Sequence, residues 1–170
     1  MCGEKHTQLQ DIAIGWLYKN GCDIFSQECQ LPNGDIADVV GVKHNGYRQH
    51  ELVKGNGQLE WETKRLDASY YIEAKASRSD LICRKQRKCY ELSVTRPVCN
   101  FYYLIVADGI KVEDTLYPEW GVLNEAGEVV RRAKRKEIPE SINPKYLKSI
   151  ERSIAHSLVY RVFGKLYFDK

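Results

Sequence analysis

The sequence predicts a mixed α/β fold in which helices pack against a single sheet. An amphipathic helical pattern opens the chain, four runs rich in β-branched and aromatic residues follow, and a second amphipathic pattern closes it. The predicted order is helix, three strands, helix, strand, short strands and helix. With 170 residues, the chain fits one domain that can bury a sizeable core.

The N-terminal third predicts a helix followed by two strands. Helical spacing of apolar residues runs over 8–19, and Asn20-Gly21 is a natural stop. A strand is expected over 22–29, and turn residues then lead into a second strand over 36–42. The helical pattern consists of Leu9, Ile12, Ala13, Trp16 and Leu17.

The middle of the chain predicts a third strand and a helix after a long polar segment. Residues 44–68 contain three glycines and are expected to form a long hairpin connection or an inserted flap. A short strand follows over 69–76, and Ser79 is the expected cap of a helix over 79–92.

The C-terminal part predicts a buried strand, a hairpin and a final helix. The apolar run 100–107 suits a central strand covered on both faces. Residues 120–124 and 128–132 resemble a hairpin, and Asn143-Pro144 is a typical helix start. The apolar stripe of that helix comprises Leu147, Ile150, Ile154, Leu158 and Val162.

Composition indicates a soluble cytoplasmic protein. The chain has no apolar run of membrane-spanning length and no apolar stretch typical of a signal peptide near its start. Its six cysteines include no C-x-x-C pair, so we expect reduced, structural thiols, with Cys22, Cys29, Cys89 and Cys99 in or beside apolar runs. Net charge is only +3, but basic residues cluster at 84–88 and 131–136, which fits either solvated faces or nucleic-acid contacts.

Charged residues interrupt two of the predicted strands. Glu73 and Lys75 share one face of an extended strand, and Asp38 directly precedes two valines on another. Burying these charges is costly unless they pair or hold a metal. The alternative is an ordinary ion pair at strand ends.

This set of residues suits phosphodiester cleavage dependent on Mg²⁺ or Mn²⁺. Asp38, Glu73 and the Ala74 carbonyl are the expected metal ligands. Lys75 is expected to orient the attacking water and stabilise charge at phosphorus, because the neighbouring carboxylates keep it protonated. Asp38, Glu73 and Lys75 are therefore the predicted catalytic residues.

Asp38 followed by Glu73-Ala74-Lys75, in this order of elements, resembles the PD-(D/E)XK nuclease superfamily. The wider pattern, which continues through Ser77-Arg78-Ser79-Asp80-Leu81, Arg84-Lys85, Tyr90 and the aromatic strand from Asn100, is similar to the MmcB-like family of DNA-repair nucleases. The resemblance covers roughly residues 6 to 130. It departs at Cys83, where an aspartate is expected, and in the long insert at 44–68.

The resemblance implies a restriction-endonuclease-like core (helix, three-stranded meander, helix, strand), and the C-terminal helix expected from the sequence pattern follows it. The nuclease-like domain would span 1–135, and 136–170 would supply a helix packed on it. The implied activity is metal-dependent cleavage of DNA, of repair or mobile-element type. A homodimer is left open, because many such folds dimerise to cut two strands. The alternatives are a catalytically inactive DNA- or protein-binding module, and a nuclease acting on RNA or branched junctions.

Five residues after the motif are candidates for substrate binding. Ser77 and Arg78 suit either a phosphate contact or an ordinary strand-to-helix turn. Lys85 falls within the core-facing arc of the predicted helix, so it either snorkels or points at an anionic site. Gln86 and Tyr90 form a Q-x-x-x-Y pair similar to that of RecB-type nucleases, although Tyr90 also suits plain packing.

Other residues are weaker candidates. Gln8 or Glu4 could complete the metal shell from the first helix, and Glu28 could approach it from the first strand. Asp35 competes with Asp38 as a ligand. Trp61 either stacks on a base or anchors the flap. The four histidines show no ligand spacing and are expected at the surface or in local hydrogen bonds.

Overall fold

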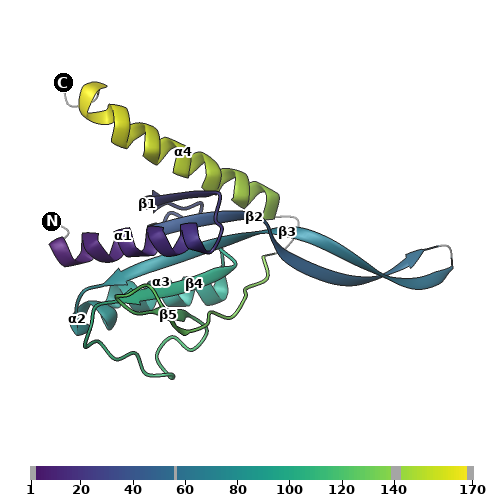
Figure 1. Ribbon diagram of the computed structural model, residues 1–170, viewed down its shortest axis with the longest axis horizontal. Helices are drawn as coiled ribbons and strands as arrows, with labels where there is room; N and C mark the ends of the chain where they lie inside the picture. Colours follow the sequence, from purple (N-terminus) through teal and green to yellow (C-terminus); the bar gives the residue numbers. More distant parts are fainter. Residues whose placement is uncertain (1–2, 56, 139–142, 168–170) are drawn as a thin grey trace.

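The computed structural model describes residues 3–55, 57–138 and 143–167, and its centre is one six-stranded mixed sheet with helices on both faces (Figure 1). The elements in chain order are α1 (Glu4–Lys19), β1 (Ile24–Gln30), β2 (Ile36–Gly55), β3 (Gln58–Lys75), α2 (Arg78–Leu81), α3 (Arg84–Thr95), β4 (Phe101–Val106), β5 (Gly121–Leu123), β6 (Val129–Arg131) and α4 (Asn143–Tyr167).

The strands lie in the sheet in sequence order. β1, β2 and β3 form an antiparallel meander, β4 and β5 are parallel to β3, and β6 returns antiparallel to β5. The crossover from β3 to β4 runs through α2 and α3. The prediction of a mixed α/β fold around one sheet is therefore confirmed.

Apolar residues fill two cores, one on each face of the sheet. On one face Leu9, Ala13 and Leu17 of α1 pack in a cluster with Val39 and Ile105. On the other face α2, α3 and α4 contribute to a larger cluster that surrounds Trp120. β4 supplies alternate residues to both cores, which confirms the predicted central strand.

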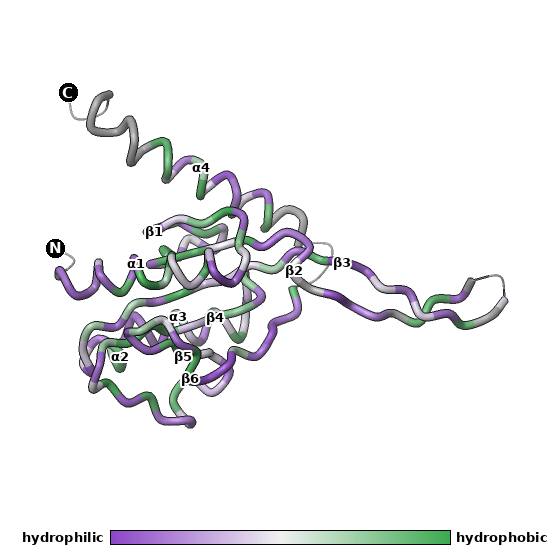
Figure 2. Tube along the Cα trace, viewed as in Figure 1, coloured by the Kyte–Doolittle hydropathy of each residue, from purple (hydrophilic) through white to green (hydrophobic). Residues whose placement is uncertain are grey.

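The segment 44–68 forms a long hairpin, one of the two forms expected for it, and not a separate flap. β2 and β3 continue through it as a paired two-stranded ribbon, which we call the arm and define as residues 47–66. The register shifts between Lys43 and Tyr47, and the arm then projects away from the sheet (Figure 1). Figure 2 shows hydrophilic residues along most of the arm and hydrophobic ones near its distal end.

The helix predicted over 79–92 is wrong in its extent. Two helices replace it, because Ser77 rather than Ser79 caps α2 and the chain breaks before Cys83, which caps α3. The break resets the helical phase, so that Gln86, Cys89 and Ser93 form the buried stripe of α3.

The terminal helices agree better with the sequence. α1 starts at Glu4, four residues earlier than predicted, and ends at the predicted Asn20-Gly21 stop. In α4, Ile150 and Ile154 are fully buried, whereas Leu158 is half exposed. Val162 of the predicted stripe lies outside the described side chains. No helix in the described ranges has the length and apolarity to cross a membrane.

Candidate active site at the fork between β2 and β3

Two strands of the sheet separate at the position of the predicted acids. The described ladder between β2 and β3 ends at the pair Val39 and Ile72, one position before Asp38 and Glu73. Beyond it, the Ala74 backbone N–H donates to Asp38 Oδ2 at 2.8 Å. A side chain thus replaces the backbone partner, and this bond fixes the Asp38 carboxylate beside the Glu73-Ala74-Lys75 segment.

Glu73 and Lys75 lie on one face of β3, as strand alternation predicts. Lys75 Nζ donates to Glu73 Oε2 at 3.0 Å and lies 3.8 Å from Asp80 Oδ1. The residues Glu73 and Lys75 are only 1% and 4% exposed. Ala74 points the other way, into the core beneath α1. The three predicted catalytic residues are therefore brought together.

A tyrosine links the site to a second aspartate. The Tyr71 hydroxyl lies 2.7 Å from Glu73 Oε1 and 3.0 Å from Asp35 Oδ2. One phenol carries one proton, so it can donate to only one carboxylate at a time. The second contact is a hydrogen bond only when a carboxyl group is itself protonated.

Burial controls the protonation of this cluster. It raises the pKa of Glu73 to about 7, and the nearby Asp38 carboxylate adds to the increase, while Lys75 and Tyr71 partly offset it. Burial alone would lower the pKa of Lys75, but Glu73, Asp80 and Asp38 outweigh it and raise that pKa. Lys75 is therefore a cation at neutral pH, which agrees with an electrostatic role rather than general-base catalysis.

A histidine that the sequence did not single out lies next to the site. His6 Nε2 on α1 is 3.5 Å from Asp38 Oδ1, and the two side chains are 16% and 14% exposed. Of the two settings expected for the histidines, the open surface or a local polar contact, His6 has the second. Its proximity to Asp38 depends on how α1 packs on the sheet, and no ligand spacing in the sequence indicates it.

The other acids and amides proposed to complete the metal shell are not assembled there. Glu4 and Gln8 are exposed on α1. Glu28 is also exposed and lines a cavity beside α4 with His156. Gln10, not Gln8, is the buried amide of α1, and its Nε2 has no hydrogen-bond partner.

The oxygen atoms of the fork fit a hard divalent cation. The N–H and C=O groups of one strand residue point to the same side, so the Ala74 carbonyl opens toward Asp38 as its N–H does. Mg²⁺ is typically held by one or two carboxylates together with waters. A cation would also relieve the repulsion that raises the pKa of Glu73. In the described part of the chain, no group of three or more His, Cys, Asp or Glu side chains is arranged as a metal cluster.

The predicted substrate residues fall into two groups. Gln86 shares the buried face of α3 with Cys89, whose thiol contacts Asp35. Gln86 is fully buried, and neither the oxygen nor the nitrogen of its side-chain amide has a hydrogen-bond partner. Such a group is rare without a ligand or water, so its position agrees with a functional role.

The remaining four have structural contacts or face solvent. Ser77 caps α2, and Arg78 forms an ion pair with Glu113. Tyr90 packs against Tyr117 and Trp120. Lys85 is exposed, so the core-facing position predicted for it is wrong, because the break before α3 shifts the phase of the helix.

The basic cluster 131–136 is largely used inside the fold. The Arg131 guanidinium donates to four backbone carbonyls, those of Glu113, Leu116, Tyr117 and Trp120. Lys134 and Lys136 both form ion pairs with Glu119. This cluster braces the loop before β5, and its charge is mostly compensated.

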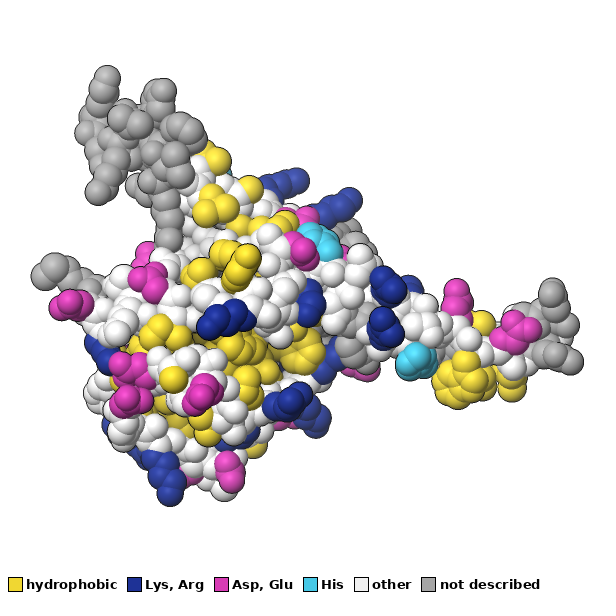
Figure 3. Space-filling view, viewed as in Figure 1, with side chains coloured by type: hydrophobic (Ala, Val, Ile, Leu, Met, Phe, Trp, Pro, Cys, Tyr) yellow, Lys and Arg dark blue, Asp and Glu magenta, His cyan; other side chains and the backbone are white. Residues whose placement is uncertain are grey.

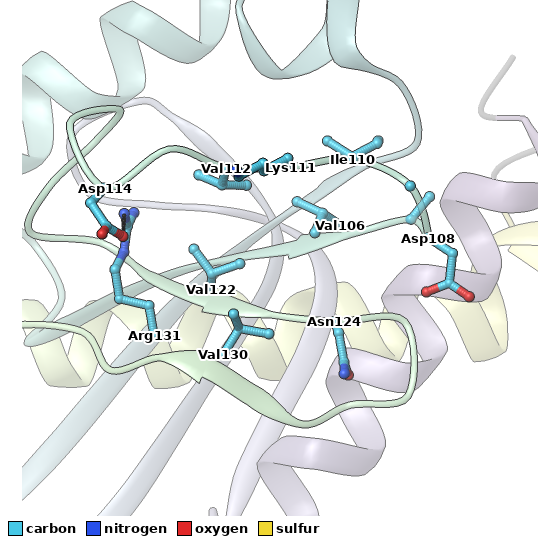
Figure 4. A pocket seen from close by; sticks show the side chains of 12 residues that line it. Val106, Asp108, Ile110, Lys111, Val112, Asp114, Val122, Asn124, Val130 and Arg131 are labelled. Carbon is cyan, nitrogen blue, oxygen red and sulfur yellow. Dashed lines mark ion pairs between the residues drawn. The ribbon is translucent and has the colours of Figure 1, made fainter.

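A cavity of about 430 Å³ lies beside β4, β5 and β6 (Figure 4). Val106, Val122 and Val130 form its apolar wall, and Arg131 faces Asp114 at its rim (Figure 4). Neither Asp38, Glu73 nor Lys75 lines it.

Comparison with known proteins gives the fold only. No family model matches the chain, and no curated protein matches it. A solved protein of unknown function from Silicibacter pomeroyi is similar in structure, with a TM-score of 0.68 at 17% sequence identity. The similarity covers 98% of this chain and 97% of that one, so this arrangement of helices around a mixed sheet, over nearly its whole length, also occurs in another protein.

Proposed function

We propose that this chain is a metal-dependent DNA endonuclease of the PD-(D/E)XK type, of repair or mobile-element type, with a restriction-endonuclease-like core. The observation that carries the proposal is the bond from the Ala74 N–H to Asp38 at the strand fork. It holds an acid from β2 against an E-x-K segment of β3. An ordinary surface ion pair needs neither this strand separation nor such burial.

Asp38, Glu73 and the Ala74 carbonyl would hold Mg²⁺ or Mn²⁺. When bound, the ion supplies Lewis acidity and acidifies a coordinated water. Tyr71 orients Glu73 through its hydroxyl. Asp80 and His6 are more exposed than Glu73 and Lys75, with 38% and 16% of their side chains accessible, and we infer that the DNA reaches the cluster past them.

Lys75 supplies the fixed positive charge of the site. Its ammonium is already oriented by Glu73 and Asp80, so it can stabilise negative charge at phosphorus without rearranging. The unpaired amide of Gln86 can donate to a phosphate oxygen or to the attacking water. We place the activity in the cytoplasm, since the five cysteines of the described chain are free thiols.

The direct test is cleavage of single-stranded, duplex and forked DNA with Mg²⁺ or Mn²⁺. We expect Asp38→Asn and Lys75→Met to lower the rate by roughly 100-fold or more, since the first removes a proposed metal ligand and the second removes the charge that stabilises the reacting phosphate. Asp114→Asn, which changes a fully exposed aspartate, is the matched control and is expected to keep full activity. Cleavage that survives both site substitutions would contradict the proposal.

Metal titration separates an enzyme from an inactive scaffold. Calorimetry with Mn²⁺ is expected to show saturable binding that Asp38→Asn removes and Asp114→Asn retains. Absence of binding to the unsubstituted protein, with DNA present, would contradict the nuclease proposal and favour the inactive binding module.

A further inference from the structure

The two faces of the arm differ in chemistry. Side chains alternate along each strand, and directly opposed residues share a face, so the register assigns every residue to one side. One side, which we call the arm face, consists of the opposed pairs Arg48 and Arg65, His50 and Thr63, Leu52 and Trp61, and Lys54 and Leu59. The other side includes Glu60, Glu62 and Lys64.

The arm face is a cationic surface without acids. Arg48 and Arg65 lie directly opposite each other, an arrangement of like charges that is unfavourable unless an anion lies between them. Neither arginine, nor Lys54, forms an ion pair with any residue of the described chain. All three side chains are exposed.

Beyond the arginines the arm face becomes apolar and aromatic. Trp61 is 73% exposed, Leu59 67% and Leu52 49%, and none of them belongs to either core. Figure 3 shows hydrophobic side chains gathered toward the distal part of the arm and basic ones nearer its root. Leaving a tryptophan and two leucines uncovered at the end of a thin ribbon is typical of a binding surface rather than of packing.

We propose that the arm face binds a single-stranded nucleic acid, with Arg48 and Arg65 on backbone phosphates and Trp61 stacked on an unpaired base. Guanidinium groups suit phosphate oxygens, and an indole stacks on any base whose face is free. A single-stranded nucleic acid accounts for both the arginine pair and the exposed tryptophan. An acidic protein surface would account for the arginines alone.

A second copy of the chain is a poor occupant. A two-fold contact of the arm face with itself would bring four arginines and two copies of Lys54 together without an acid on either side. A single-stranded nucleic acid, by contrast, supplies the negative charge that the arm face lacks.

The test measures binding of labelled oligothymidylate by fluorescence anisotropy, with a chelator present so that no metal-dependent cleavage occurs. Arg65→Gln is compared with Lys64→Gln, its matched control, because the two positions are adjacent in β3 but face opposite sides. We expect Arg65→Gln to weaken binding several-fold more than Lys64→Gln does. Arg48→Gln with Arg65→Gln should reduce the slope of log affinity against log salt by about 1.4.

Trp61 has its own readout. We expect Trp61→Ala to weaken binding roughly 5- to 150-fold and leave the salt slope unchanged, while Trp61→Phe retains most of the affinity. Oligothymidylate should quench the emission of Trp61, and Trp61→Phe should abolish that change, because Trp120 is fully buried and Trp16 of α1 packs against Tyr70 and Tyr103 of the sheet. Thermal unfolding checks that each variant is folded.

Two results from the variants would overturn the inference: equal losses of affinity for Arg65→Gln and Lys64→Gln, or full affinity in Trp61→Ala. Two results from other ligands would also overturn it: tighter binding of a matched duplex, or competition by polyglutamate as strong as that by unlabelled oligothymidylate. Binding to the arm face uses no metal, and the chelator prevents cleavage during the measurement. The outcome is thus separate from that of the proposed cleavage.

Discussion

At the scale of single residues, the protein keeps a carboxyl group where its charge is poorly tolerated. Glu73 is almost completely buried, close to Asp38, and shares the Tyr71 proton with Asp35. Its one compensating cation is Lys75 in the described surroundings. The site therefore favours an extra proton, and the divalent cation that we propose would take the place of that proton.

This arrangement predicts a dependence of stability on pH. The pKa of Glu73 is raised from 4.5 to about 7 in the folded state. Between these values the folded chain binds more protons than the unfolded chain, so the free energy of unfolding falls as pH rises, by up to about 3 kcal/mol from this group. Urea denaturation on both sides of the window should show this fall in the unsubstituted protein and not in Glu73→Gln.

Mg²⁺ provides the complementary measurement. It should restore stability on the alkaline side of the window, where Glu73 is ionised, and have little effect on the acid side. Identical pH profiles for the unsubstituted protein and Glu73→Gln would show that Glu73 titrates normally.

The site could be predicted from sequence as far as strand alternation reaches. Glu73 and Lys75 are two apart on an apolar strand, so their shared face follows directly. The contact of His6 with Asp38 joins α1 to β2 and depends on packing that no local pattern encodes. The positions of Lys85 and Gln86 depended on one helix break, which exchanged exposed and buried faces.

At the scale of elements, the break between α2 and α3 is followed by a weak helix cap. The Cys83 thiol accepts from the Gln86 N–H at 3.4 Å, and sulfur is a poor acceptor compared with the oxygen of Ser or Asp. The sequence gives no strong cap at this position, which is why one continuous helix was predicted.

Cys83→Asp is expected to stabilise the protein. A carboxylate cap at the start of α3 should add about 0.5–1 kcal/mol, which corresponds to an increase in Tm of about 1–4 °C for a chain of this size. Differential scanning calorimetry measures the change, and Cys83→Ala, which has no acceptor, should not raise Tm. Equal Tm values for the Asp and Ala variants would show that capping does not limit α3.

At the scale of the whole molecule, the described part of the arm shares no hydrophobic core with the rest of the fold, which we call the body. Both cores lie on the sheet within the body, where α4 completes the larger one through Ile150 and Ile154. No described residue of the arm belongs to either core. In the sequence, only the polarity of residues 47–66 indicates that they lie outside the cores. A flap and an extended ribbon have similar composition, and only the pairing of 47–55 with 58–66 distinguishes them.

Removing the arm should therefore leave the body folded. Replacing residues 49–64 by an Asn-Gly turn, which favours two-residue hairpins, is expected to change Tm by only a few degrees and to keep a single cooperative transition. Circular dichroism during heating tests this, with Trp61→Ala as a control that leaves the arm in place. A broad or multi-step transition would mean that the arm stabilises the sheet.

One consequence of the continuous strands concerns how the arm could be lengthened or shortened. Deleting one opposed pair near its root would shift the tip by about 3.3 Å and turn every distal side chain to the reverse side. Deleting two pairs would restore the original orientation at a reach shorter by about 7 Å. Only deletions or insertions of an even number of opposed pairs therefore keep the arm face turned toward the same ligand.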